Sequence, residues 1–350
     1  MSKQSAAQLR LVRGADSAAI FTLSQEQEAA RSHRGSPLII TGRTGTGKTR
    51  ALIEAAVSRI QAGQSPDSIL LLTYGRDRAS ELRDAIVIAT NESAYEPLAR
   101  TFHSLAYSIL KMRTGDEYRD LVLMSGSEQE SLIADLLEGD ITSGYRSWHK
   151  DLQRGPDSLG EPLATQGFVR ELRDLIMRAN ERGITPTELA ERGHQLGEKY
   201  WPGAADFWNR YLEGLGLQES LAGDAKMRID PSEIINLAKR YLTKNSELLA
   251  ELRGRFTTII VDEFQESDPS QRELLDLLAG QDLIIVADTK SAVGRFRGAD
   301  PEGVSAVLDK YISAGATKIE FTTNFRGTPE KSTARLLSES EEAQDRKSVV

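Results

Sequence analysis

A glycine-rich segment at residues 42–49 has the residue types and spacing of a phosphate-binding loop. It reads GRTGTGKT and fills every fixed position of the pattern G-x-x-x-x-G-K-T. Glycines at this spacing let backbone N–H groups surround phosphate oxygens, and a helix that begins here adds the positive end of its dipole. We expect Lys48 to neutralise the β- and γ-phosphates of a nucleotide and Thr49 to ligate Mg²⁺. The predicted phosphate-binding residues are Gly42, Arg43, Thr44, Gly45, Thr46, Gly47, Lys48 and Thr49.

Two adjacent carboxylates, Asp262 and Glu263, follow the β-branched run at 257–261. A carboxylate at the end of a buried strand can hold Mg²⁺, and a second one beside it can act as the general base for an attacking water. An apolar run followed by Asp-Glu is also common at solvated strand ends. The complete phosphate loop in the same chain favours the catalytic interpretation, so we predict Asp262 as a metal ligand and Glu263 as the base.

This chemistry requires a scaffold that brings the loop and the carboxylates together. Short apolar runs precede both segments and recur elsewhere, and stretches with helical periodicity follow them. The apolar runs are 38–40, 68–73, 257–261 and 283–286, and the helical stretches are 49–60, 77–88 and 270–278. Unbroken apolar strands that alternate with helices indicate an α/β fold, with a parallel sheet covered by helices on both faces.

The stretch between these two regions, about 111–223, has a different character. It is polar, helical in pattern and contains Trp148, Trp201 and Trp208. We interpret it as a helical insertion into the α/β domain. The simplest role for its tryptophans is to anchor the core of a helix bundle, and the alternative is a surface that contacts duplex nucleic acid.

The composition excludes several classes of protein. With 350 residues, 39% of them hydrophobic, the chain can bury a sizeable core, which excludes general disorder. The absence of cysteine excludes disulfides and thiolate chemistry, and four scattered histidines argue against a zinc centre. No apolar run approaches the ~18 residues of a membrane span and the N-terminus lacks a secretory signal, so we expect a cytoplasmic protein. Taken alone, the net charge of −8 argues against nucleic-acid binding.

Several further segments occur in an order that resembles the superfamily 1A DNA helicases of the UvrD/Rep/PcrA type. The resemblance runs from about Leu23 to Thr328. Besides the phosphate loop, the segments that carry it are LSQEQ at 23–27, TYGR at 73–76, TFHS at 101–104, DEFQ at 262–265, FRGA at 296–299 and NFR at 324–326. The family implies a RecA-like P-loop NTPase domain with a helical insertion subdomain, and ATP and Mg²⁺ as cofactors.

The resemblance also implies roles for nucleotide-site residues outside the loop. Gln27 would read the adenine edge, and Arg50 and Phe325 would hold the adenine between a guanidinium and an aromatic ring. Arg326 would reach the γ-phosphate as an arginine finger from a second motor domain, so hydrolysis would depend on closure of the cleft. Gln265 completes the D-E-x-Q signature at the nucleotide. The implied catalytic residues are Lys48, Asp262, Glu263 and Arg326.

The implied partners are single-stranded DNA and ss/ds DNA junctions. This family grips DNA mainly through base stacking and a local groove, so an acidic net charge does not exclude it. Phe296 would stack on a base of the tracked strand, a contact worth ~1–3 kcal/mol. Core packing is the alternative role for Phe102 and Phe296 taken singly. The implied DNA-binding residues are Thr73, Tyr74, Arg76, Thr101, Phe102, His103, Phe296 and Arg297.

The chain departs from the family pattern at several positions. Ser291 stands where a glutamine normally senses the γ-phosphate, and Gly294 stands where a stacking tyrosine is usual. Thr323 replaces a glutamine, and Arg43 is bulky at a loop position normally held by a small residue. Because serine cannot span the distance that glutamine spans, we expect weakened coupling of hydrolysis to movement, with nucleotide binding retained.

The resemblance predicts the domain organisation as well. Domain 1A would comprise residues 1–111 and 223–315, around a helical subdomain 1B at 112–222, and domain 2A would begin at 316–344. Residues 345–350 correspond to the translation of a common sequencing adapter. We therefore expect them to be foreign to the natural protein, and the chain to be the N-terminal portion of a longer motor.

The predicted function is an ATP-dependent DNA helicase that moves 3′→5′ on single-stranded DNA, of the repair or recombination type. The alternative is a catalytically weakened motor subunit with a nuclease or repair-protein partner. The serine at position 291 favours that alternative, whereas Lys48, Glu263 and Arg326 oppose it. An unrelated P-loop GTPase or kinase would not explain the segments at 101–104 and 324–326, and no membrane partner is expected.

Overall fold

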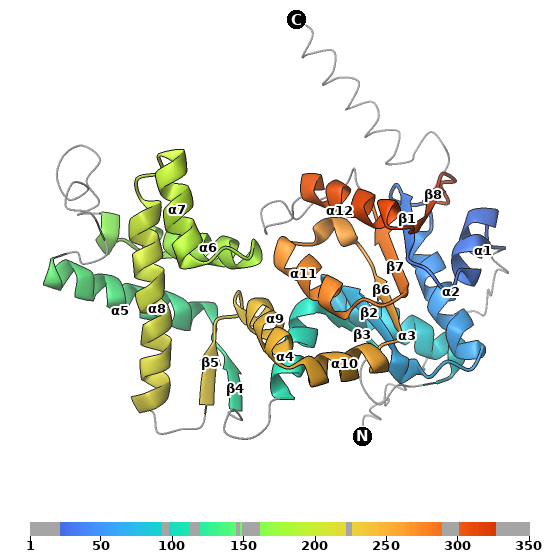
Figure 1. Cartoon of the computed structure of the whole chain (residues 1–350), viewed down its shortest axis with the longest axis horizontal. Coiled ribbons are helices and arrows are strands. Elements are labelled where there is room, and N and C mark those ends of the chain that lie inside the picture. Colours follow the sequence, from blue (N-terminus) through green and yellow to red (C-terminus); the bar gives the residue numbers. More distant parts are fainter. Residues whose placement is uncertain are drawn as a thin grey trace, which may run out of the picture.

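The predicted α/β fold class is confirmed by the computed structural model of the chain, in which helices flank a parallel sheet (Figure 1). The structure describes residues 22–92, 98–112, 120–144, 148, 162–221, 226–288 and 301–326.

The main sheet has six strands in the order β3-β2-β6-β7-β1-β8, and every neighbouring pair is parallel. The strands are β1 (Leu38–Gly42), β2 (Ile69–Thr73), β3 (Ala99–Thr101), β6 (Thr258–Val261), β7 (Asp282–Ala287) and β8 (Thr317–Phe321). The next strand along the chain after the phosphate loop, β2, is thus three places from β1, with β6 and β7 between them. Since all six strands run in the same direction, their carboxyl ends meet at one edge of the sheet.

Successive residues of the central strands enter two different cores. Ile39 belongs to one buried cluster and Ile40 to the other, and Ile259 and Ile260 divide in the same way. Side chains alternate across a strand with period two, so a strand covered on both faces needs apolar residues at every position. This explains the unbroken apolar runs in the sequence.

Helices cover both faces of the sheet, with α1 and α2 to its right and α9 and α11 to its left in Figure 1. One face is covered by α1 (Gln25–Ser32), α2 (Lys48–Gln61) and α3 (Arg76–Thr90). The other is covered by α4 (Phe102–Lys111), α9 (Ile234–Lys244), α10 (Ser246–Arg255), α11 (Pro269–Leu278) and α12 (Pro301–Ser313). Short 3₁₀ turns lie at Pro66–Ser68, Pro162–Ala164 and Phe264–Glu266.

A second, helical unit is inserted between α4 and α9 and lies beside the sheet (Figure 1). It contains α5 (Gly126–Ser143), α6 (Gln166–Glu181), α7 (Pro186–Leu196) and α8 (Trp201–Leu221), with the parallel pair β4 (Asp120–Leu123) and β5 (Lys226–Ile229) at its base. Its own core buries Trp148 and Trp208, as expected of core anchors, and Trp201 is half-buried against that core.

The predicted domain boundaries stay predictions, with one structural qualification. β8 pairs with β1 along its whole length, so the first strand of the segment 316–344, which we predicted to begin domain 2A, is part of the main sheet. The predicted adapter-derived residues 345–350 lie outside the described ranges.

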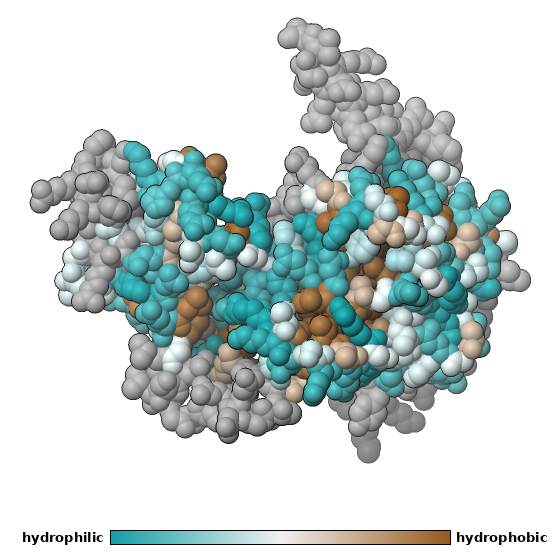
Figure 2. Space-filling model, in the orientation of Figure 1, coloured by the Kyte–Doolittle hydropathy of each residue, from teal (hydrophilic) through white to brown (hydrophobic). Residues whose placement is uncertain are grey.

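The described surface is mainly hydrophilic over both units in the face shown in Figure 2, where apolar side chains gather in scattered groups and not in a continuous band. Within the described ranges, no helix is long and apolar enough to cross a membrane.

Candidate nucleotide and DNA site

The loop between β1 and α2 adopts a conformation that only its glycines allow. Gly45 and Gly47 have φ angles of +90° and +79°, in the left-handed region that disfavours other residues. A Cβ atom on Gly45 would lie 2.6 Å from Oδ1 of Asn324. Gly47 is also the N-cap of α2, and no side chain caps the N–H groups at this helix end. The N–H groups of the first helical turn therefore remain available to an anion.

Lys48 lies inside this loop with its ammonium held by the loop's own carbonyl groups. Its Nζ donates to the carbonyl oxygens of Gly42 at 2.7 Å and Arg43 at 3.1 Å. The same atom is 3.6 Å from a carboxylate oxygen of Asp288, at the end of β7. Thr46 also donates to the Arg43 carbonyl, at 2.8 Å, which stabilises the turn. The structure thus places a buried cation at the centre of the phosphate loop.

Asp262 directly follows β6 at the same edge of the sheet and is fully buried (0% exposed). Its backbone N–H donates to Leu72 on β2, and its Oδ1 has no hydrogen-bond partner among the described residues. Burial raises the pKa of Asp262, as does the neighbouring Glu263, and Arg78 partly opposes the rise. A buried carboxylate oxygen without a donor is suited to a cation.

Glu263 has an unusual backbone conformation for its residue type. Among the described residues other than glycine, only Asn91 and Glu263 have a positive φ, which is 52° for Glu263. Strained backbone of this kind concentrates at functional sites. Gln265 donates its amide to the Glu263 carboxylate and accepts the N–H of Asp288 at 2.8 Å. Gln265 thereby connects the predicted base to the end of β7.

Arg78 is a site residue that sequence reasoning did not identify. It lies in the first turn of α3, two residues after the TYGR segment ends. Its guanidinium donates to Asp262 Oδ2 at 3.1 Å and to Thr49 Oγ1 at 2.5 Å. The sequence does show a basic residue in the first turn of the helix that follows 68–73. It could be assigned to the site only with the knowledge that this strand pairs with β6.

The residues predicted to contact the base lie at the mouth of the same loop. Gln27 is buried, accepts the Ser24 N–H as part of a capping box, and donates to the Thr46 carbonyl at 3.4 Å. Phe325 is 49% exposed, and its backbone N–H donates to the Gly45 carbonyl at 2.9 Å. Arg50 is exposed and pairs with a glutamate one turn along α2.

One cavity of about 510 Å³ brings most of the predicted nucleotide residues together. Its lining residues are Thr44, Gly45, Gly47, Lys48, Thr49, Arg50, Ile53, Arg78, Glu263, Phe325 and Arg326. They come from the phosphate loop, α2, α3, the end of β6 and the segment after β8. The Phe325 hydrogen bond joins the segment after β8 to the loop. Within that segment, the Asn324 side chain accepts the Arg326 N–H at 2.8 Å.

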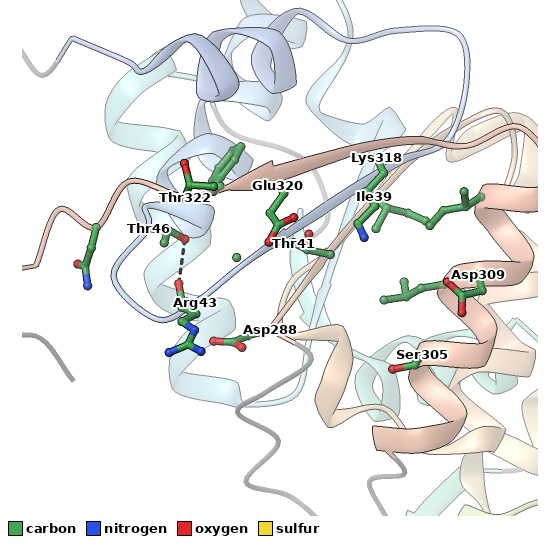
Figure 3. A pocket seen from close by; sticks show the side chains of 15 residues that line it. Ile39, Thr41, Arg43, Thr46, Asp288, Ser305, Asp309, Lys318, Glu320 and Thr322 are labelled. Atoms are coloured by element: carbon green, nitrogen blue, oxygen red, sulfur yellow. Dashed lines mark hydrogen bonds between the residues drawn. The ribbon is translucent and has the colours of Figure 1, made fainter. Parts of the chain in front are cut away.

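A second cavity of about 520 Å³ lies on the other side of the phosphate loop, between β1, β8 and α12 (Figure 3). Arg43 and Asp288 lie at one end of it, and Ser305 and Asp309 of α12 line the facing wall. The bulky Arg43 therefore extends away from the cavity that holds Lys48 and Thr49.

The predicted DNA-binding residues divide into exposed and buried groups. Arg76 and His103 are exposed and follow β2 and β3, whose last residues are paired in register. Thr101 caps α4 by accepting the Ser104 N–H, and Thr73 is buried in the sheet.

The aromatic pair at this edge consists of one buried ring and one partly buried ring. Phe102 is 1% exposed and belongs to the main core, and its ring centroid lies 5.4 Å from that of half-buried Tyr74. This placement corrects the expectation of a base-contacting Phe102, because a ring enclosed by the core cannot stack on DNA. Phe296 and Arg297, with the substituted positions Ser291 and Gly294, lie outside the described residues.

The fold and the loop together define a RecA-like P-loop domain with a helical insertion. The chain belongs to the family described as the UvrD/REP helicase N-terminal domain, whose model matches residues 23–312. This confirms the resemblance drawn from the motifs.

Individual relatives are distant in sequence and considerably longer. The chain is 25% identical over 309 residues to DNA helicase II of Salmonella typhimurium, which covers 87% of this chain and 38% of the relative. It is 26% identical over 311 residues to the ATP-dependent DNA helicase PcrA of Staphylococcus epidermidis, with the same coverage. A putative ATP-dependent DNA helicase, YjcD of Bacillus subtilis, is 25% identical over 317 residues, which is 37% of its length. The chain therefore spans less than two-fifths of the curated relatives it matches.

Proposed function

We propose that this chain is the N-terminal part of an ATP-dependent DNA helicase that moves 3′→5′ on single-stranded DNA and unwinds duplexes from ss/ds junctions. The observation that carries the proposal is the convergence of Lys48, Thr49, Glu263 and Arg326 on one cavity, with Asp262 behind it. These groups come from three separate stretches of the chain. Their meeting supports a catalytic site more strongly than any one motif does.

The residues of the cavity fit a magnesium ion. Mg²⁺ prefers hydroxyl and carboxylate oxygens and binds through one or two carboxylates together with phosphate oxygens. The Thr49 hydroxyl and the Asp262 carboxylate are bridged by a single guanidinium, so both lie within reach of one cation. The bound ion would neutralise charge on the phosphates as the terminal phosphoryl group is transferred.

The chain's own residues would perform the remaining steps of hydrolysis. Lys48 holds the phosphate charge with the N–H groups of the loop. Glu263 orients and deprotonates the attacking water, and Gln265 fixes the Glu263 carboxylate through its amide. Arg326 is already in the lining of the cavity, from which it would stabilise the charge that develops on the γ-phosphate.

The base-recognition roles are also supported by the geometry. Gln27 uses one amide N–H and one lone pair within the protein, which leaves a second donor and a second acceptor for an adenine edge. The half-exposed ring of Phe325 and the exposed guanidinium of Arg50 both line the cavity and come from different elements. We propose that they hold the base between them.

The DNA path would cross the carboxyl edge of β2 and β3, where Arg76 and His103 are exposed. Thr73, Tyr74 and Thr101 would then shape this edge from within rather than contact DNA extensively. Phe296 would supply the stacking contact, as the family resemblance implies.

Nucleotide binding and hydrolysis by the purified chain test the proposal. We expect a fluorescent ATP analogue to bind, and Lys48→Ala to weaken that binding at least tenfold, because the loop loses its cation. We expect little or no unwinding by the 350-residue chain, since it spans less than two-fifths of the length of the helicases it matches. Equal binding by the wild type and Lys48→Ala would contradict the proposed site.

A second candidate is a motor subunit with weakened hydrolysis, which works with a nuclease or repair-protein partner. The specific observation that favours it is the position of Arg78 on the oxygens predicted to hold the metal. Steady-state hydrolysis with and without single-stranded DNA separates the two candidates, because only the first predicts stimulation by DNA.

A further inference from the structure

The Arg78 guanidinium makes contacts that a metal ion at this site would also make. Nε donates to Asp262 Oδ2 and Nη2 donates to Thr49 Oγ1, while Nη1 donates to Glu81 Oε2 at 3.2 Å. Thr49 and Asp262 are the two predicted metal ligands. Each of the three guanidinium nitrogens therefore donates a hydrogen bond, and two of these bonds go to oxygens of the predicted metal site.

The fold explains how this side chain reaches the site. α3 starts directly after β2, which is hydrogen-bonded to β6, so the first turn of α3 stands over the carboxyl end of β6. Arg78 extends from that turn across to the start of α2. The Glu81 carboxylate, one turn further along α3, holds the guanidinium from behind.

Charge at the site favours a resident cation. The Asp262 side chain is 1% exposed, whereas that of Arg78 is 31% exposed, so the arginine neutralises a carboxylate that water does not reach. A charge-assisted hydrogen bond to such a carboxylate is stronger than a neutral one. Mg²⁺ needs the same oxygens at about 2.0–2.1 Å, which is too close for the guanidinium to remain between them.

We propose that Arg78 is an intramolecular cation that competes with Mg²⁺ for Thr49 and Asp262, and that metal-loaded nucleotide displaces it. The inference rests on the proposed Mg-nucleotide site and adds a residue that sets how much Mg²⁺ that site requires. Once displaced, Arg78 can retain its Glu81 contact, because that contact lies within its own helix. Its half-exposed position at the cavity wall leaves room for such a movement.

The test compares the wild type with Arg78→Gln and Arg78→Lys in the full chain. Arg83→Gln is the matched control, because Arg83 lies on the same helix and bonds Ser80 and Asp84 instead of the metal oxygens. Glutamine removes the charge. Lysine keeps the charge for folding, but its single ammonium cannot engage all three oxygens at once.

Two readouts separate the metal from the nucleotide. The first is the melting temperature with millimolar MgCl₂ and no nucleotide, against KCl of equal ionic strength. We expect Mg²⁺ alone to raise the melting temperature of Arg78→Gln by a few degrees, with no selective rise for the wild type or Arg83→Gln. The second is the Mg²⁺ concentration that half-saturates binding of a fluorescent ADP, which we expect Arg78→Gln to lower about tenfold and Arg78→Lys less.

The outcomes distinguish this inference from the proposed function. If Arg78→Gln shows no Mg²⁺-specific rise and needs as much Mg²⁺ as the wild type, or more, the competition is refuted. If the Mg²⁺-specific rise is present but neither protein binds the fluorescent ADP, Arg78 does occupy a cation site and the nucleotide proposal fails instead. If Arg78→Gln does not fold, Arg78→Lys provides the test. A lower Mg²⁺ requirement than that of the wild type would support the competition, and an equal or higher one would refute it.

Discussion

The amide nitrogen of Gln27 lies 2.4 Å from the position that a Cβ atom on Gly47 would occupy. The N-terminal helix is therefore seated directly on the phosphate loop, and the residue predicted to read the base touches the glycine that starts the phosphate-binding helix. Only a residue without a side chain allows this approach. The predicted base and phosphate subsites are thus joined by a van der Waals contact between Gln27 and Gly47.

Gly47→Ala tests this coupling. We expect it to lower the free energy of unfolding by about 2 kcal/mol, from the left-handed backbone and the displaced Gln27 together, and to weaken nucleotide binding. Gly63→Ala is the control, because Gly63 has a φ of +95° but nothing within 4 Å of its Cβ position. Urea unfolding measures both variants. Equal losses in the two would mean that the Gln27 contact contributes nothing.

Glu263→Gln tests the assignment of the general base. We expect the rate of ATP hydrolysis to fall ~10²–10⁴-fold, because the amide cannot accept the proton of the attacking water. Binding of the fluorescent ATP analogue should change little, since the proposed base would contact the water and not the phosphates. Glu266→Gln, in the 3₁₀ turn for which Glu263 is the N-cap, serves as the control. A parallel loss of binding and hydrolysis would argue against a role as base.

A buried ion pair joins α2 to the start of β7, where Arg59 forms a bidentate contact with Asp282 at 2.6 and 2.8 Å. Arg59 is 1% exposed. We expect Asp282→Asn to destabilise the protein by about 3–5 kcal/mol, because it leaves a buried guanidinium without a counter-charge. The double variant Arg59→Met/Asp282→Asn should recover part of that loss. Urea unfolding of the wild type and the two variants checks this. If the double variant recovers nothing, the loss does not come from the unpaired guanidinium.

Two carboxyl groups make the junction between the helical unit and the sheet sensitive to pH. Burial raises the pKa of Glu181, at the end of α6, and of Asp268, the N-cap of α11, each to about 7, and the charge of Asp268 adds to the effect on Glu181. The folded state therefore holds these protons more tightly than the unfolded state does. The resulting stability is full below about pH 4 and is lost as pH rises through 7.

Glu181→Gln should remove part of this dependence. We expect it to stabilise the protein by roughly 1–2 kcal/mol at pH 8 and by much less at pH 5, where the native carboxyl is protonated. The free energy of unfolding in urea at several pH values provides the measurement. Glu171→Gln, at an exposed position on the same helix, is the control. A constant difference between Glu181→Gln and the wild type across this range would contradict the assignment.

Local spacing determined much of this protein. The phosphate-binding loop at 42–49 could be predicted because backbone geometry over a few residues dictates the positions of its glycines and of the lysine that follows. The two cores were implied by unbroken apolar runs, since a strand buried on both faces needs apolar residues at each position. The carboxylates after 257–261 were placed correctly at the sheet edge, because parallel strands end on the same side.

Tertiary structure decided which distant side chains meet. Arg78 donates to Thr49 and to Asp262, which are 29 and 184 positions away in the sequence. These contacts depend on the pairing of β2 with β6, which no local sequence pattern predicts. The burial of Phe102 and the pairing of β8 with β1 likewise follow from which surfaces the sheet and helices cover. A residue's type and spacing limit what chemistry it can perform. The packing of remote elements determines whether it performs that chemistry, holds the core, or occupies the place of a metal ion.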